Sequence, residues 1–138
     1  MRLRDRRAPL PGAILSMSPW YDMELKNQTL ESKAQTDEIL SRPGLESFRE
    51  SWLGGTGVAW DDPRVNMLYA DLAGLPPTMI FCGEDEMLVG EAIELAKRAE
   101  AAGVDAACAP YSRVSTRSSW VPAGCPRWTR RSRRWVGG

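Results

Sequence analysis

The residues with the clearest chemical potential form an acidic loop, Gly83-Glu-Asp-Glu86, which follows the short apolar run Thr78–Cys82. Such a run is typical of a buried strand. Functional sites gather in loops at the carboxyl ends of parallel strands, so Asp85 is a candidate site residue. The chemistry open to this loop is that of carboxylates, because the chain contains no histidine. It therefore supplies no imidazole as a base, proton shuttle or metal ligand.

The three cysteines, Cys82, Cys108 and Cys125, do not form a C-x-x-C pair. Without histidine or paired cysteines, we expect no zinc or haem site and no other metal or cofactor. Cys82 and Cys108 stand in apolar runs, where a free cysteine behaves as a small buried hydrophobic residue. These two thiols are therefore interpreted as core residues.

Three short apolar runs and one clear helix must position the acidic loop. Residues 13–17, 78–82 and 106–111 have the length and flanking residues of buried strands. Alanines and a leucine mark one face of a helix over residues 91–102, and Gly103 is placed to end it. This order of elements predicts an α/β architecture with a parallel sheet.

A polar, helical insertion separates the first two strands. It covers residues 22–57 and is broken at Arg42-Pro43-Gly44. Ser47 and Glu50 have the capping-box spacing, which predicts a helix beginning near Phe48 and ending at the glycine cluster 54–57. That cluster lacks the Lys-Ser/Thr of a phosphate-binding loop. Residues 61–77 are expected to be connecting structure with one short helix.

Charge divides the chain into two parts. The 138 residues are 43% hydrophobic and 26% charged, which excludes a disordered or collagen-like protein. Lys+Arg and Asp+Glu are both 18, yet residues 112–138 hold 7 arginines, three tryptophans and no acid. We therefore interpret residues 1–111 as a domain and residues 112–138 as a separate, aberrant basic tail that we expect to be disordered.

Three segments, in order, resemble bacterial hormone-sensitive-lipase-like esterases of the α/β-hydrolase fold. The first is Gly12-Ala-Ile-Leu-Ser-Met-Ser-Pro-Trp-Tyr-Asp22, and the second is Asp62-Pro63 followed by Tyr69-Ala-Asp-Leu-Ala-Gly-Leu-Pro-Pro77. The third is Gly83-Glu-Asp-Glu-Met-Leu88, and Ala101-Ala-Gly-Val-Asp105 leads into the last strand. The resemblance covers about residues 8–111 and implies a carboxylic ester hydrolase acting on small esters.

The resemblance implies a Ser-Asp-His mechanism in which Asp85 is the acid of the triad. The sequence departs from the family pattern at Gly90, where the family has a second acid, and at Asn66-Met67, where it has Ser-Pro. No Gly-x-Ser-x-Gly motif and no histidine-containing oxyanion loop occur. We therefore expect the carboxyl-terminal portion of a hydrolase, inactive by itself, with an unpaired sheet edge.

The tail departs from the family pattern after about residue 112. A shifted reading frame would explain this, because G/C-rich codons across Ser115–Thr116 can encode the expected histidine. Gene sequences from independent isolates check this hypothesis. The alternative is a non-catalytic fragment in which Arg127–Trp135 binds nucleic acid or an anionic membrane surface, with binding that weakens steeply with salt.

The sequence gives fewer indications of the cellular location and of the substrate pocket. No secretory signal and no apolar run of about 18 residues occur, so a cytoplasmic protein is expected. The resemblance places the insertion beside the substrate pocket, which four aromatic residues could line: Trp20, Phe48, Trp52 and Trp60. Core packing explains these aromatic residues equally well.

Overall fold

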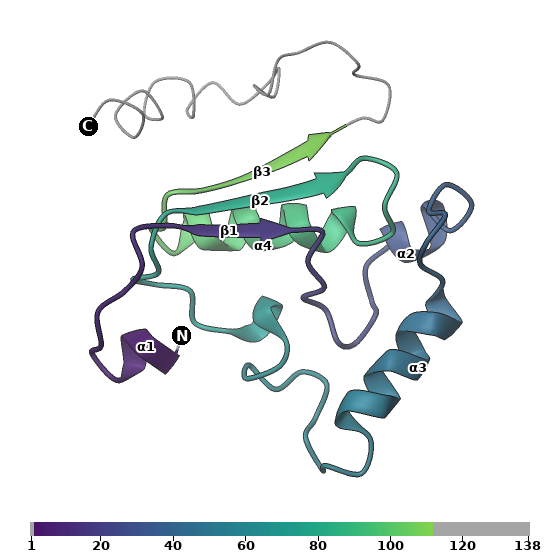
Figure 1. The fold of residues 1–138 in the computed structure, drawn as a ribbon, viewed down its shortest axis with the longest axis horizontal. Coiled ribbons are helices and arrows are strands. Elements are labelled where there is room, and N and C mark those ends of the chain that lie inside the picture. Colours follow the sequence, from purple (N-terminus) through teal and green to yellow (C-terminus); the bar gives the residue numbers. More distant parts are fainter. Residues whose placement is uncertain (1, 112–138) are drawn as a thin grey trace.

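The computed structural model describes residues 2–111, and these form a three-stranded parallel sheet with a helix packed on it. The strands are β1 (Ile14–Met17), β2 (Thr78–Gly83) and β3 (Ala106–Tyr111), in the order β1-β2-β3. Figure 1 shows the three arrows pointing the same way, with α4 (Val89–Ala101) running along the sheet. The predicted α/β architecture with a parallel sheet is confirmed.

The register of the strands assigns their side chains to two faces. Ile14 pairs with Thr78, and Ile80 pairs with Cys108. Ile80 and Cys82 pack against α4, which buries Ala92, Leu95, Ala96 and Ala99 in the same cluster. Alternate residues of a strand point to opposite faces, so Met79 and Phe81 lie on the other side of the sheet. There they meet Ala107 and Ala109.

Helix α4 begins two residues earlier than predicted, at Val89 rather than Glu91. Its end agrees with the prediction, since Gly103 has a φ of +80° and its amide donates to the Glu100 carbonyl. Only glycine adopts such a left-handed conformation without strain, so this residue closes the helix and turns the chain into β3.

The insertion contains α2 (Thr29–Ser32) and α3 (Arg42–Leu53). The predicted break at Arg42-Pro43-Gly44 was wrong, because these residues form the first turn of α3. Ser41 caps that helix by accepting a hydrogen bond from the Gly44 amide at 3.3 Å. Proline is well tolerated in a first turn, where its missing N–H needs no partner. The predicted end at the glycine cluster is confirmed.

The insertion has its own small core beside the sheet. Leu25, Leu30 and Leu45 pack against Met87 and Leu88, the residues that follow the acidic loop. A short 3-10 helix, η1 (Met67–Tyr69), interrupts the connection to β2, as predicted. A four-residue helix, α1 (Arg2–Asp5), precedes β1. None of the helices within residues 2–111 is long and apolar enough to cross a membrane.

Candidate functional site

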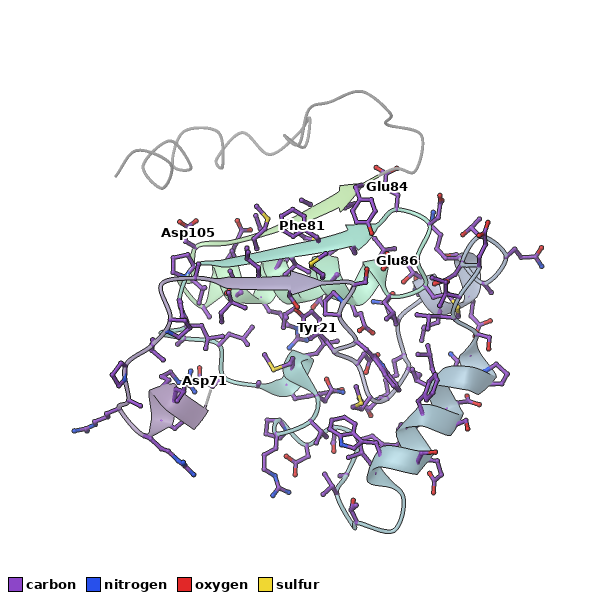
Figure 2. All side chains as sticks on the ribbon, viewed as in Figure 1. Tyr21, Asp71, Phe81, Glu84, Glu86 and Asp105 are labelled. Atoms are coloured by element: carbon purple, nitrogen blue, oxygen red, sulfur yellow. The ribbon has the colours of Figure 1, made fainter. Side chains whose placement is uncertain are left out.

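The acidic loop lies at the carboxyl end of β2. Figure 2 shows Glu84 and Glu86 where the strand arrows end, while Asp105 lies at the opposite end of the sheet. Asp85 stands between the two glutamates, and its side chain is 48% exposed. The structure therefore places this predicted site residue where a carboxylate remains open to a partner group, at the edge where α/β proteins gather their sites.

Glu86 fastens the loop to the sheet. Its Oε1 accepts hydrogen bonds from the Gly83 amide and from the Ser18 hydroxyl, both at 2.9 Å. The Glu86 amide in turn donates to the Gly83 carbonyl at 3.2 Å. Ser18 directly follows β1 and has a φ of +41°, an uncommon conformation for a residue with a side chain. One carboxylate thus ties together the ends of two neighbouring strands.

The insertion holds the other side of the loop. The Thr36 hydroxyl donates to the Asp85 carbonyl oxygen at 3.0 Å, and Asp37 Oδ2 accepts from the Met87 amide at 2.9 Å. Lys33 Nζ lies 3.9 Å from Asp85 Oδ1. An ion pair this long and exposed contributes little to stability, about 0–1 kcal/mol. The backbone contacts, rather than the ion pair, fix the position of Asp85.

Gly90 shows how the chain accommodates its departure from the family pattern. A Cβ atom at this position would collide with the side chains of Asn27 and Thr29. The Thr29 hydroxyl accepts from the Gly90 amide at 3.1 Å and donates to the Met87 carbonyl at 2.7 Å. Side chains of the insertion thus fill the space that a side chain at position 90 would need. Their hydrogen bonds also attach the insertion to the residues that follow Asp85.

Asn66, the second departure, is fully buried. Its Nδ2 donates to Asp22 Oδ1 at 3.2 Å and to the Trp60 carbonyl at 3.0 Å, and its Oδ1 accepts from the Leu68 amide at 3.1 Å. Asp22 is also buried and accepts from the Glu24 and Lys26 amides. Asn66 therefore organises the connections around η1.

Glu91 is a buried carboxylate that the sequence placed on a helix without assigning it a role. It is 0% exposed, its Oε1 accepts from the Tyr21 amide, and its Oε2 has no hydrogen-bond partner. Burial raises the pKa of Glu91 to about 8, hydrogen bonds from the Tyr21 and Asp22 amides lower it, and the Asp22 charge raises it. Glu91 joins α4 to the segment that leaves β1.

The two described cysteines, one in β2 and one in β3, lie close together on the face of the sheet that packs against α4. Cys82 Sγ and Cys108 Sγ are 3.6 Å apart, and Cys82 is fully buried, as predicted. The hydrogen bond with Cys108 and burial both raise the pKa of Cys82. No cluster of three or more His, Cys, Asp or Glu side chains that could hold a metal occurs within residues 2–111.

The structure gives contacts for two of the four aromatic residues proposed for a substrate pocket, Trp20 and Trp60. Trp20 packs against the core of the insertion. Phe48 and Trp52 are mostly exposed on α3, and Trp60 stacks on the buried Arg49, whose Cζ lies 3.5 Å from the ring centroid. Core packing therefore accounts for Trp20, and a cation–π contact accounts for Trp60. The Arg127–Trp135 segment lies outside the described residues.

A parallel sheet, a covering helix and an acidic loop at the strand ends place the described residues in the α/β class, and similarity to known proteins identifies the family. A family model described as "alpha/beta hydrolase fold" matches residues 1–115. The chain belongs to the α/β-hydrolase family, in its hormone-sensitive-lipase-like esterase branch. The resemblance inferred from the sequence is confirmed.

Known relatives agree with this assignment. The chain is 32% identical over 104 residues to an esterase of Acinetobacter venetianus, covering 75% of this chain and 34% of the relative. It is 34% identical over 104 residues to an acetyl-hydrolase of Streptomyces hygroscopicus, covering 73% and 33%. A solved esterase from the bacterial hormone-sensitive lipase family is 37% identical, with a TM-score of 0.76, covering 80% of this chain and 37% of that structure. The chain thus spans about a third of the length of these two curated relatives.

The contacts of Glu86 lead to a local prediction. Replacing Glu86 with Ala removes the acceptor of the Gly83 amide and of the Ser18 hydroxyl, and leaving such groups unpaired costs about 1–3 kcal/mol. Hydrogen exchange at the Gly83 amide should therefore become about tenfold faster or more, as measured by NMR or mass spectrometry. Glu84→Ala, an exposed neighbour, is the matched control and should leave that rate unchanged. Equal acceleration in both variants would contradict the assigned contact.

Proposed function

We propose that this chain carries the acid of a Ser-Asp-His triad in a carboxylic ester hydrolase, with Asp85 in that role. The observation that carries the proposal is the loop itself. Asp85 lies at the carboxyl end of β2, half exposed, on a backbone fixed by Thr36 from one side and by Glu86 from the other. A triad acid must be held rigidly and must reach the imidazole that it orients.

The neighbouring acids are less suited to this role. Glu86 accepts hydrogen bonds from Gly83 and Ser18, and Glu91 is fully buried on α4. Relatives described as an esterase and as an acetyl-hydrolase support a small carboxylic ester as the substrate class. Neither a nucleophile motif nor a histidine occurs in this sequence, so Asp85 is the one triad member that we assign in it.

This proposal predicts that the purified chain does not hydrolyse p-nitrophenyl acetate or butyrate above the rate in buffer. The reason is chemical: without an activated serine and an imidazole base, the carboxylate has no group to orient. Release of p-nitrophenolate measures the rate. The Asp85→Asn variant is the control and should give the same background. Turnover that depends on Asp85 in the isolated chain would contradict the proposal.

The Arg/Trp-rich tail was the basis of the alternative function, binding of nucleic acid or an anionic membrane. That segment lies outside the described residues, and the relatives cited above are hydrolases. We therefore propose ester hydrolysis, rather than nucleic-acid or membrane binding, as the function.

A further inference from the structure

A turn in the insertion lies directly against the acidic loop. The turn covers residues 33–36 and follows α2, and Figure 1 shows α2 beside the loop that joins β2 to α4. The Thr36 and Asp37 amides both donate to the Lys33 carbonyl at 3.0 Å. The turn therefore has backbone hydrogen bonds of its own, which do not involve the loop that it contacts.

Asp37 uses both of its carboxylate oxygens. Its Oδ1 accepts from the Ile39 amide at 3.0 Å and from the Leu40 amide at 2.9 Å, which fixes the side chain on its own segment. Its Oδ2 accepts from the Met87 amide at 2.9 Å, across 50 residues of sequence. Asp37 therefore joins the insertion to the residue that stands two positions after Asp85.

Met87 is held at both of its backbone polar groups. Its amide donates to Asp37, and its carbonyl accepts from the Thr29 hydroxyl at 2.7 Å. Its side chain is 0% exposed and packs in the core of the insertion. By packing and by hydrogen bonding, Met87 therefore belongs to the insertion, although it lies just after Asp85 in the chain.

The Asp85 carboxylate takes its direction from the backbone that carries it. Within residues 2–111 its one ion pair is the 3.9 Å contact with Lys33, which is too long to fix an angle. The Thr36 hydroxyl lies 3.0 Å from the Asp85 carbonyl oxygen and 3.1 Å from the Lys33 carbonyl oxygen, so two acceptors share its proton. A catalytic group displaced by about 1 Å can lose about 100-fold in rate. The contacts that hold this backbone therefore matter to the reaction.

We propose that Thr36 and Asp37 are positioning residues for ester hydrolysis, which hold the acidic loop so that the Asp85 carboxylate points at the imidazole of the triad. This inference rests on the proposed role of Asp85. Both residues act through the loop backbone and not through contact with the substrate. Loss of either contact therefore lowers kcat and leaves KM unchanged.

Hydrogen exchange in the full chain tests the contact itself. Asp37→Asn leaves one oxygen for the three amides that the carboxylate now accepts from. Exchange at the Met87 amide should become at least tenfold faster. Gln35→Ala, an exposed neighbour in the same turn, is the matched control and should leave that rate unchanged. An unchanged rate in Asp37→Asn would overturn the proposal.

Kinetics test the positioning role. In a chimera, residues 8–111 of this chain replace the matched segment of the Streptomyces hygroscopicus acetyl-hydrolase. Thr36→Val removes the hydroxyl but keeps the shape of the side chain. Thr36→Val and Asp37→Asn should each lower kcat for p-nitrophenyl acetate by about 10- to 100-fold, with KM within twofold of the parent. Thr36→Ser, which restores the hydroxyl, and Gln35→Ala should match the parent.

Asp85→Asn in the same chimera separates this inference from the proposed function. If Asp85→Asn loses activity while Thr36→Val and Asp37→Asn keep the parent kcat, the positioning role is overturned and the triad role of Asp85 stands. If Asp85→Asn keeps the parent kcat, both are overturned. A rise in KM at constant kcat, or a Thr36→Ser variant as slow as Thr36→Val, also overturns positioning. Should Asp37→Asn not fold, the two variants at the exposed Thr36 decide the result.

Discussion

Asp85→Asn is expected to lower kcat by about 10⁴-fold in a chimera that contains a complete triad, the loss typical of a triad acid changed to its amide. In the chimera, residues 8–111 of this chain replace the matched segment of the Streptomyces hygroscopicus acetyl-hydrolase, which supplies the remaining polypeptide. A carboxylate at position 85 holds the catalytic imidazole in the required tautomer and stabilises its cation. The amide does neither, so the rate of p-nitrophenyl acetate hydrolysis falls.

The control for this experiment is Glu84→Gln, one residue away in the same loop and exposed. It should change kcat less than twofold, since Glu84 has no part in the assigned triad. Both variants should unfold at the temperature of the parent chimera, because Asp85 makes one long ion pair with Lys33. Loss of activity in the Glu84 variant, or near-normal kcat in the Asp85 variant, would contradict the assignment of Asp85 as the triad acid.

Local patterns were sufficient to predict the strands and the end of α4. Residues 78–82 and 106–111 are short apolar runs, and their burial in a parallel sheet follows from that composition. Gly103 ended the helix for a reason visible in the sequence, the freedom of glycine to adopt a positive φ. The candidate residue Asp85 was found in the same way, from its place after a strand.

Competing local signals explain the error at α3. Ser47 and Glu50 have the spacing of a capping box, but Ser41 lies before Pro43 and caps the helix six residues earlier. Both serines satisfy a local rule. The choice depends on tertiary packing, because a start at Arg42 includes Leu45 in the helix and buries it against Leu25 and Leu30. Such packing overrides local propensity.

The hydrogen bonds that hold the acidic loop could not be predicted from the sequence, because they join residues that are far apart in the chain. Thr36 is 49 residues from Asp85, and Ser18 is 68 residues from Glu86. No local pattern in a single sequence indicates contacts between residues this far apart. Glu91 was missed for another reason: an acidic residue near the start of a helix is ordinarily exposed, and nothing local indicates that the Tyr21 amide lies above it.

Glu91 should make the chain less stable as the pH rises from about 5 to 8. Its pKa is about 8 in the folded chain against an ordinary value of 4.5, since burial disfavours the charged form. Between these values the folded state binds more protons than the unfolded state. The free energy of unfolding therefore falls with increasing pH, by an amount on the order of 3 kcal/mol. The chain has no histidine to add a titration of its own in this range.

Glu91→Gln isolates this effect, because glutamine resembles the protonated acid in shape and can still accept from the Tyr21 amide. We expect the variant to match the parent near pH 5 and to exceed its stability at pH 8, as measured by urea unfolding with tryptophan fluorescence. Glu94→Gln on the same helix is the control, since Glu94 is partly exposed and paired with Arg98 at 2.9 Å. That variant should keep the slope of the parent. Two results would contradict this assignment: a parent chain whose stability is constant or rises over this range, and a Glu91→Gln variant that keeps the parent's dependence of unfolding free energy on pH. Either result would show that Glu91 stays ionised in the folded chain. The backbone amides of Tyr21 and Asp22 would then compensate its burial.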